Sequence, residues 1–584
     1  MNPSTAMATV LVDELVRSGV RHVVLCPGSR SAPLAYAAQA AERAGRLTLH
    51  VRVDERAAGF LAVGLAKLTR VPAVVITTSG TAVANLHPAV LEAHHGVVPL
   101  IVVSADRPVE LRGTGANQTT VQPGMYADAV RWSVDAAAPQ RLAGEVARWR
   151  ALAAAAVRHA IGAVDAAEPG PVHLNIQLRE PLVPTDEEPW PEPLDAEGVD
   201  DSAHDPADDS AAESAAEGGA VGVEAVARTL VLVGDLPEPD QFERAVRWAS
   251  IRGWPVVAEP FGTHPRPGVL PHGPLVLSDP GWLDEHAPDR VIAVGRLTLS
   301  RPVAALLRRP GTRVEAVGVH GWIESRPDIH AVHPVSVLDA PATSTSVDEQ
   351  DHRWSQSWRA AGDRITSALA DGSGERLPWP SGLAVAEAVQ GNLPPGATVF
   401  LGSSSSARDV DLAAPRAEAL RVVASRGLAG IDGCVSTAVG LALAGHDPAY
   451  ALMGDLTFLH DANGLLIGPL ERRPDLTIVV TNDDGGGIFT LLEPGEPERA
   501  ADFERIFGTP TGVDLGALCA AHHVAHQQIS SRAELVDALA RRPSGLTVLE
   551  VVVDRAGHRV QHAALRRASA DAVREGGAAA YPAR

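Results

Sequence analysis

The sequence predicts an α/β protein made of parallel sheets flanked by helices. Short apolar runs rich in Val, Ile and Leu alternate with stretches of helical periodicity, as in successive strand–helix–strand units. Polar and glycine residues gather directly after these runs, where open parallel sheets place their ligands. The chain has 584 residues, more than one hydrophobic core usually organises, so we expect about three domains.

Residues 1–185 are predicted to form the first domain. The first 19 residues lack a basic segment followed by an apolar one, so we interpret them as a helix rather than a signal peptide. The predicted strands are HVVLCP (22–27), LTLHVRVD (47–54), PAVVITTSG (72–80) and PLIVVSAD (99–106). The polar segments PGSRS (27–31), DER (54–56), TSGT (78–81) and ADRP (105–108) lie at or just after their ends. Four such ends at one sheet edge predict a ligand site.

Residues 186–225 are predicted to be an acidic linker. Residues 186–217 contain 13 acidic residues and no Lys or Arg. Their Asp, Glu, Ser, Ala and Pro cannot bury enough apolar surface to form a core, which predicts a solvated connection. Two further loops are expected at 341–349 and 371–382.

The rest of the chain is predicted to form two more domains. Residues 226–345 form a smaller central α/β domain, with strands in TLVLVGD, PVVAEP, RVIAVGR and RVEAVG. Residues 346–584 form the last domain, with strands in ATVFLGSSSS, LRVVASRG, AYALMGD, LTIVVTNDDGGG and LTVLEVVVD. Most of these runs also end in polar or glycine-rich turns.

Charge, hydropathy and cysteine usage exclude several classes. The net charge of −21 argues against nucleic acid or an anionic membrane as a partner. No run approaches the ~18 apolar residues that a membrane span needs, and we expect a cytoplasmic protein. Cys26, Cys434 and Cys519 show no C-x-x-C spacing, so we expect three buried thiols rather than a disulfide framework or a thiolate metal site.

The single lysine narrows the possible enzymes. Lys67 stands in LAVGLAKLTR, which is neither a P-loop nor a pyridoxal-phosphate lysine motif, and we interpret it as a helix-surface residue. The serine-hydrolase motif G-x-S-x-G is absent, and GTGANQ at 113–118 lacks the third glycine of a dinucleotide fingerprint. Serine hydrolases and simple Rossmann dehydrogenases are therefore disfavoured.

Two strand ends in the last domain predict a metal site. Asp455 follows one strand, and Asp483 with Gly485 follows the next. Hard divalent cations take carboxylate and carbonyl oxygens together with substrate phosphates, so we expect Mg²⁺, with Mn²⁺ as an alternative. Each feature alone is more often a helix N-cap or an Asp-Gly turn, whereas the pair at this spacing favours the metal.

The spacing of these residues resembles a known cofactor signature. GD, about 26 residues and then N-[DN]-x-G is typical of thiamine-diphosphate enzymes, although this chain has Leu456 in place of the final glycine of GDG and Asp483 where asparagine is usual. Nearly the whole chain resembles the 2-succinyl-5-enolpyruvyl-6-hydroxy-3-cyclohexene-1-carboxylate (SEPHCHC) synthase family. The resemblance is carried by PGSRS, DERAAGFLAVGLAK, TSGTAVANLHPAVLEA, ADRPVEL, GANQTT-x-QPGM, SRGLAGIDG and GGGIFTLL.

The resemblance implies a fold, a cofactor and a reaction. It implies a three-domain thiamine-diphosphate fold, with residues 1–185 binding the pyrimidine and 346–584 the diphosphate. It also implies a transferase that decarboxylates 2-oxoglutarate on thiamine diphosphate. The succinyl carbanion equivalent then adds to isochorismate in a 1,4-addition, giving SEPHCHC and CO₂ in menaquinone biosynthesis.

The resemblance also implies site residues. Glu55 would hydrogen-bond the pyrimidine nitrogen N1′ and promote the imino tautomer that removes the thiazolium C2 proton. Ile431 would hold the cofactor bent. The implied cofactor residues are Glu55, Ser79, Gly80, Ile431, Gly454, Asp455, Leu456 and Ile488, and the implied metal ligands are Asp455, Asp483 and Gly485. On composition alone, Glu55 is more often a first-turn helix acid and Ile431 a core residue.

Both implied substrates are dicarboxylates, which guanidinium groups bind well. The resemblance places Ser404, Arg408 and Arg426 around the succinyl part, with Phe489 and Leu492 as apolar wall near the cofactor. It places Ser29, Arg30, Arg107, Asn117, Gln118 and Arg301 around isochorismate; Ser300 stands where some relatives have lysine. A surface salt bridge is the ordinary role of any single arginine.

The resemblance finally implies a homodimer or homotetramer in which Glu55 of one chain faces Asp455 of another. Two alternatives stay open at this point. The chain could be another thiamine-diphosphate-dependent 2-oxoacid decarboxylase or synthase, or a non-catalytic metabolite-binding protein on the same fold.

Overall fold

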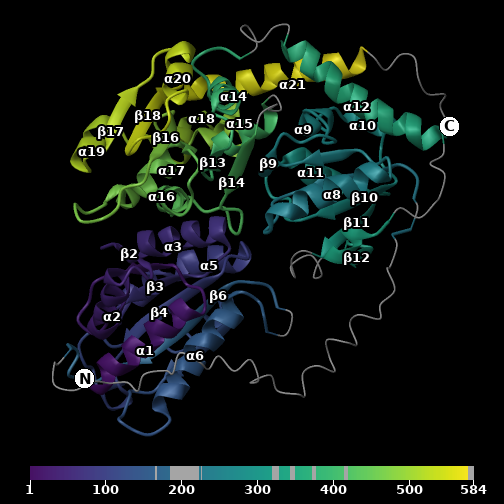
Figure 1. The fold of residues 1–584 in the computed structure, drawn as a ribbon. Coiled ribbons are helices and arrows are strands. Elements are labelled where there is room, and N and C mark those ends of the chain that lie inside the picture. The colour runs from purple at the N-terminus through teal and green to yellow at the C-terminus, as the bar shows by residue number, and fades with distance from the viewer. Residues whose placement is uncertain are drawn as a thin grey trace.

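The computed structural model describes residues 1–164, 167–184, 223–224, 226–318, 328–341, 349–370, 377–413 and 419–575. The chain forms three sheets flanked by helices, which confirms the predicted α/β class (Figure 1). In Figure 1 the first sheet lies below, the third above it and the second beside the third. The predicted linker 186–225 lies outside the described residues, apart from 223–224. Most of the two predicted loops, 341–349 and 371–382, also lies outside them.

The first sheet has six parallel strands in the order β2-β1-β3-β4-β6-β5. The strands are β1 (His22–Leu25), β2 (Thr48–Val51), β3 (Ala73–Thr77), β4 (Leu100–Asp106), β5 (Trp132–Ala136) and β6 (Pro171–Gln177). The helices are α1 (Pro3–Arg17), α2 (Ala32–Arg43), α3 (Glu55–Thr69), α4 (Thr81–Asn85), α5 (His87–His95) and α6 (Glu145–Ala160). The N-terminal stretch is thus a helix, as the sequence predicts.

The second sheet has five parallel strands in the order β12-β11-β10-β7-β8. The strands are β7 (Thr229–Val233), β8 (Val256–Ala258), β10 (Arg290–Val294), β11 (Arg313–Gly318) and β12 (Ala331–Pro334). The helices are α8 (Pro239–Ile251), α9 (Gly273–Val276), α10 (Pro280–Glu285) and α11 (Arg301–Leu306).

The third sheet has seven strands in the order β17-β18-β16-β15-β13-β14-β9. They are β9 (Gly262–His264), β13 (Ala397–Leu401), β14 (Leu420–Ala424), β15 (Ala449–Gly454), β16 (Leu476–Asn482), β17 (Ala525–Gln528) and β18 (Leu546–Val552). Only β9 is antiparallel to its neighbour, and it comes from the stretch of chain between β8 and β10. The helices from residue 349 onward are α12 (Glu349–Ala370), α14 (Gly382–Asn392), α15 (Ser405–Leu412), α16 (Cys434–Ala444), α17 (Asp455–His460), α18 (Ala500–Phe503), α19 (Leu515–Ala521), α20 (Arg532–Leu539) and α21 (His558–Arg574). Of these, α12 packs into the apolar core of the second sheet.

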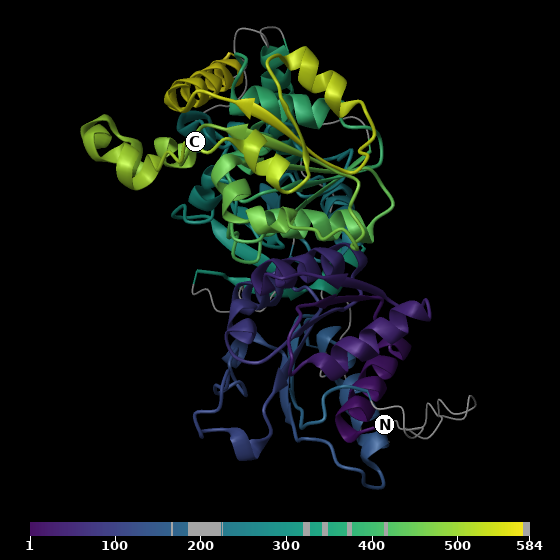
Figure 2. The same cartoon turned by 90° about the vertical axis from the view of Figure 1, so that its left-hand side faces the viewer.

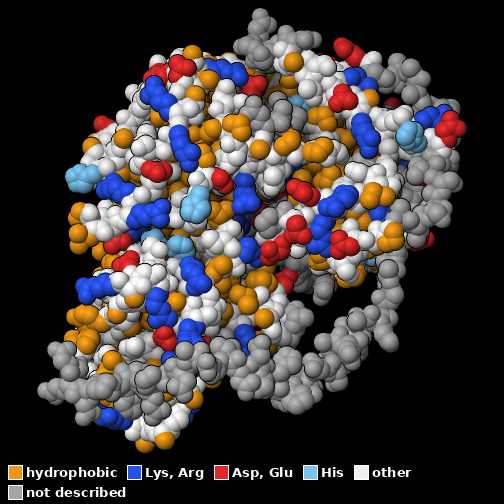
Figure 3. Space-filling view, viewed as in Figure 1, with side chains coloured by type: hydrophobic (Ala, Val, Ile, Leu, Met, Phe, Trp, Pro, Cys, Tyr) orange, Lys and Arg blue, Asp and Glu red, His pale blue; other side chains and the backbone are white. Residues whose placement is uncertain are grey.

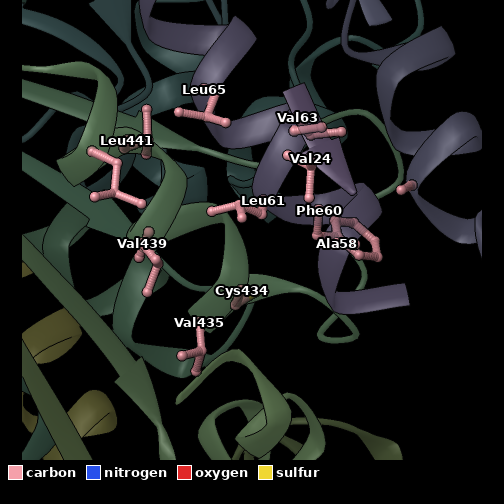
Figure 4. Close-up of a cluster of buried hydrophobic side chains, with 14 of the residues drawn as sticks. Val24, Ala58, Phe60, Leu61, Val63, Leu65, Cys434, Val435, Val439 and Leu441 are labelled. Atoms are coloured by element: carbon pink, nitrogen blue, oxygen red, sulfur yellow. The ribbon is translucent and has the colours of Figure 1, made fainter. Parts of the chain in front are cut away.

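One apolar core joins the first and third sheets through α3 and α16. Figures 2 and 4 show the two helices side by side, with Leu61 and Leu65 pointing toward Leu441. Two glycines bring the backbones close. A Cβ at Gly64 would meet the backbone of Thr437, and one at Gly440 would meet the backbone of α3. This contact fixes the start of α3 relative to the third sheet.

The structure confirms the prediction for the cysteines but not the one for the lysine. All three cysteines are buried free thiols, as predicted. Lys67 is not exposed on the helix surface, because its side chain is only 11% exposed. Its Nζ lies 3.9 Å from Oδ2 of Asp235, a residue that follows β7 of the second sheet. The sequence of α3 alone does not show that the second domain covers the side of the helix that carries Lys67.

The molecular surface is mixed in charge. On the face shown in Figure 3, basic and acidic side chains are interspersed. Within the described ranges, no helix is long and apolar enough to cross a membrane.

Candidate active site

A cavity of about 250 Å³ opens at the carboxyl ends of the central strands of the third sheet. Its walls come from the loops after β13, β15 and β16 and from the loop that joins β14 to α16. Nine residues predicted from the sequence line it: Ser404, Ile431, Gly454, Asp455, Leu456, Asp483, Gly485, Ile488 and Phe489. The topology brings them together because parallel strands present their carboxyl ends at one edge.

Two carboxylates stand at adjacent strand ends in this cavity. Asp455 begins α17 directly after β15, and its Oδ2 accepts a hydrogen bond of 2.8 Å from the Gly485 N–H. Asp483 follows β16, the parallel neighbour of β15. Burial raises the pKa of Asp455 to about 6, and burial together with the charge of Asp455 raises the pKa of Asp483 to about 7. Two carboxyls this close destabilise each other's charge, which a bound cation would relieve.

The oxygens in the cavity fit a hard cation and a phosphate. Asp483 Oδ1 and the hydroxyls of Ser403 and Ser405 are buried without a hydrogen-bond partner in the described part of the chain. No cluster of three His, Cys, Asp or Glu side chains suited to a metal occurs among the described residues. A cation here would therefore need further oxygen ligands from the main chain and from a bound phosphate.

A histidine at the same end of the cavity was not predicted. His558, in the first turn of α21, lines the cavity with its Nδ1 3.8 Å from Asp483 Oδ2. One turn later, His562 Nε2 lies 3.0 Å from Asp409 Oδ1, and Asp409 lines the cavity too. An i, i+4 histidine pair is a weak signal, because a helix face of this kind is more often core.

Predicted arginines gather beside the cavity. Arg408 donates a 3.3 Å hydrogen bond to the Ser404 carbonyl. Arg426 donates to the Thr298 hydroxyl at 2.8–2.9 Å and to its carbonyl at 3.1 Å. Burial and the charges of Arg426 and Arg301 lower the pKa of Arg408. Cations that destabilise one another in this way mark a place suited to carboxylates.

A second group of predicted residues lies at the carboxyl edge of the first sheet. Gln118 Nε2 donates to the Ser79 carbonyl at 2.9 Å, the Ser79 hydroxyl donates to the Gln118 carbonyl at 3.0 Å, and Arg107 donates to the Ser79 hydroxyl. A Cβ at Gly80 would meet the Gln118 side chain. Burial and the charge of Arg107 lower the pKa of Arg30, so these two guanidinium groups are also close.

The remaining predicted substrate residues are more open. Ser29, Asn117 and Arg301 are exposed, and Leu492 is half-buried after the turn that contains Phe489. None of the first-domain residues lines the cavity of the third sheet within the described parts of this single chain.

Glu55 begins α3 and does not line the cavity among the described residues. Its neighbours bind the third domain of the same chain instead. Asp54 accepts a 2.7 Å hydrogen bond from Asn463, and Arg56 donates one of 2.8 Å to the His460 carbonyl. The start of α3 is therefore held beside α17 with Glu55 half-buried.

Comparison with known proteins gives concordant results. Residues 5–126 match the family model for the N-terminal thiamine pyrophosphate binding domain, and residues 405–551 match the model for the C-terminal one. A solved structure of benzoylformate decarboxylase from Polynucleobacter necessarius has a TM-score of 0.63 over 95% of this chain and 99% of that chain, at 18% identity. It supports the fold alone.

Three curated relatives share the same name, 2-succinyl-5-enolpyruvyl-6-hydroxy-3-cyclohexene-1-carboxylate synthase. The protein from Saccharopolyspora erythraea is 48% identical over 97% of this chain and all of its own length. That from Kineococcus radiotolerans is 48% identical over 95% and 97%, and that from Rhodococcus erythropolis 45% identical over 97% and 99%. The chain therefore belongs to the 2-succinyl-5-enolpyruvyl-6-hydroxy-3-cyclohexene-1-carboxylate synthase family of thiamine-diphosphate-dependent enzymes.

Proposed function

We propose that this chain joins a decarboxylated 2-oxoglutarate to isochorismate, giving SEPHCHC and CO₂ as a step of menaquinone biosynthesis. One observation carries the proposal: Asp455 and Asp483, with raised pKa values, face a cavity at the ends of β15 and β16. The family relationship supplies the identity of the substrates. We place the enzyme in the cytoplasm, where these small anions would be its substrates.

The cavity residues fit thiamine diphosphate and a divalent cation. Asp455, Asp483 and the Gly485 carbonyl would hold Mg²⁺ or Mn²⁺, since the buried Asp483 Oδ1 has no partner in the described chain. The orphaned hydroxyls of Ser403 and Ser405 would donate to the diphosphate. Bound thiamine diphosphate supplies the electron sink for decarboxylation and the carbon nucleophile for the addition.

Glu55 would act on the cofactor in the cavity of a second copy of the chain. There its carboxyl would hold a proton against the pyrimidine nitrogen N1′. A group of exposed apolar side chains near Glu55 supports this arrangement. Val53 is 64%, Leu466 43% and Leu470 96% exposed. Hydrogen bonds between residues 51–54 and 463–471 bring the segments that carry all three side chains together, so a second copy that covers these segments would bury apolar surface.

We accordingly propose a homodimer, or a homotetramer built from such dimers. In a two-fold dimer the same patch covers both subunits, so two equivalent sites would form. Each would combine the first domain of one chain with the third domain of the other.

The arginines would orient the two acids. Arg408 and Arg426, beside Ser404, would bind the distal carboxylate of 2-oxoglutarate. Arg30, Arg107 and Gln118 of the first-sheet edge, with Ser29, Asn117 and Arg301, would bind isochorismate. Ile431, Leu456, Ile488, Phe489 and Leu492 would supply apolar wall and exclude water from the reacting carbon.

A direct assay tests the proposal. Purified protein is mixed with thiamine diphosphate, Mg²⁺, 2-oxoglutarate and isochorismate, and loss of isochorismate is followed. We expect turnover that needs every component and falls about a hundredfold or more in Glu55→Gln, because proton transfer contributes on that order.

The exposed Glu243 on α8 provides a matched control, since Glu243→Gln removes the same charge away from the cavity. We expect unchanged turnover in that variant. No isochorismate loss with the unaltered chain would overturn the proposed function, and full turnover in Glu55→Gln would overturn the role of Glu55 alone.

A further inference from the structure

A buried carboxylate ties the first domain to a loop of the third. Glu92 lies on α5 and is 4% exposed. Its Oε1 accepts a 2.8 Å hydrogen bond from the N–H of Gly427, and its Oε2 accepts one of 2.7 Å from the N–H of Leu428. Both carboxylate oxygens are thus engaged by consecutive backbone amides more than 300 residues away in the sequence.

Burying a carboxylate costs free energy, so the groups around Glu92 decide whether it stays ionised. Desolvation raises the pKa of Glu92, whereas the two amides and the charge of Lys67 favour its ionised form. Lys67 is the only lysine of the chain, and its Nζ also lies 3.9 Å from Asp235 of the middle domain. The carboxylate is therefore held at a junction of three domains, where its direct hydrogen bonds go to one short loop.

That loop carries two residues of the proposed site. It runs from the end of β14 to the start of α16. Arg426 precedes the two tethered amides and binds Thr298. Ile431 follows them and lines the cavity. Among the described residues Glu92 does not line the cavity, so any effect on chemistry would pass through the loop.

The loop geometry depends on the close approach of Glu92. A Cβ at Gly427 would meet both the backbone carbonyl and the carboxylate of Glu92. Ala429 adopts φ +56°, in the left-handed region that non-glycine residues seldom occupy. A backbone in that conformation persists when surrounding contacts determine it. The two hydrogen bonds to Glu92 hold Gly427 and Leu428, the two residues directly before Ala429.

We propose that Glu92 is a positioning residue for the reaction, which holds loop 425–433 so that Arg426 and Ile431 meet substrate and cofactor in register. The inference rests on the proposed function for its effect on turnover. The tether itself is a property of the chain alone. Small displacements of positioning groups cost up to about a hundredfold in rate, so the effect is measurable.

The first test uses Glu92→Gln. The amide keeps one acceptor but turns an NH₂ group toward one of the two backbone N–H groups, so one hydrogen bond is lost. Hydrogen exchange followed by mass spectrometry on the cofactor-free protein should show about tenfold faster exchange at Gly427 and Leu428, as expected for one lost bond. With cofactor bound, kcat should fall about tenfold to a hundredfold.

A matched control removes the charge from a different contact between domains. Glu238 of the middle domain binds Arg70 of the first at 2.9 and 3.2 Å and does not touch the loop. In Glu238→Gln we expect exchange at Gly427 and Leu428, and kcat, to match the unaltered chain. Equal loss of kcat in both variants would mean that Glu92 has only a general structural role.

A second variant keeps the carboxylate and moves the loop. Gly427→Ala places a methyl group against Glu92 and should reproduce the faster exchange and the lower kcat. It keeps the test decisive if Glu92→Gln does not fold. Unaltered exchange, or faster exchange with unaltered kcat, in the variant that folds would overturn the inference. If the unaltered chain itself consumes no isochorismate, the proposed function fails, and the exchange data alone decide the tether.

Discussion

Buried carboxylates are central to the proposed chemistry at the residue scale. Asp455 and Asp483 were predictable from the sequence, because a carboxylate directly after a buried strand must lie at the sheet edge. Glu92 and Glu259 were not predictable. Their hydrogen-bond partners lie in other parts of the chain, and nothing in their local sequence differs from an ordinary exposed glutamate.

Glu259 gives a prediction for pH. Its Oε1 accepts hydrogen bonds from the N–H groups of Leu299 at 2.6 Å and Ser300 at 3.3 Å, while Oε2 is buried without a partner in the described chain. Burial raises its pKa from 4.5 to about 7. The folded state therefore holds this proton more tightly than the unfolded state. The contribution of protonated Glu259 to the stability of the fold is complete below pH 4.5 and is lost as the pH rises through about 7.

Glu259→Gln should remove this titration, because its carbonyl can accept both hydrogen bonds and its NH₂ replaces the unpaired oxygen. Thermal melts of the cofactor-free protein from pH 5 to pH 8 should show the variant gaining stability relative to the unaltered chain as the pH rises. Glu243→Gln, on the surface, should show a constant difference. A difference that is independent of pH for Glu259→Gln would contradict the raised pKa.

At the scale of elements, burial decided which strands could be predicted. β3, β4 and β15 are almost wholly buried and apolar, and each corresponds to a predicted run. β5, β12 and β17 alternate or lie half-exposed at sheet edges and were not predicted. β6 was missed for another reason: PVHLNIQ contains buried polar residues, and His173 and Asn175 both bond to Ser104 across the sheet.

The contact between α3 and α16 gives a prediction for stability. Gly64→Ala places a methyl group against the Thr437 backbone, which cannot rotate away as a side chain would. We expect a loss of about 1–3 kcal/mol in the free energy of unfolding, typical of an overpacked core. Urea denaturation measures it.

Gly391→Ala, near the end of α14, is the matched control, since a Cβ there has open space. That change should stabilise by up to about 1 kcal/mol through helix propensity. Equal effects of the two substitutions would mean that α3 and α16 do not approach as closely as described.

At the scale of the whole molecule, the division of labour between domains stays a prediction. The strand β9, which comes from residues 226–345, joins the third sheet rather than the second. A strand of only three residues is too short for its sequence to indicate which strand it pairs with. Figure 2 shows one more feature that sequence pattern did not predict: the segment after Asp483, which contains α18, extends away from the third sheet.

The proposed dimer, which the family resemblance already implies, agrees with the position of Glu55 in the folded chain. The two neighbours of Glu55, Asp54 and Arg56, bind the third domain of the same chain, yet Glu55 does not line that domain's cavity within the described residues. The sequence placed Glu55 and Asp455 in one site through family resemblance. Their placement here supports a site completed by a second subunit, in which the exposed Val53, Leu466 and Leu470 become buried.

Mixing two inactive variants tests this central claim most directly. Glu55→Gln lacks the carboxyl proposed to hold the proton, and Asp455→Ala lacks a proposed metal ligand, so each variant alone should be nearly inactive. If the two residues act across a subunit interface, a dimer with one copy of each variant has one intact site. Random reassociation of equal amounts should then restore about a quarter of the turnover of the unaltered protein, because half of the dimers are mixed. No recovery, with mixed dimers demonstrated by mass spectrometry of differently tagged chains, would contradict a shared site.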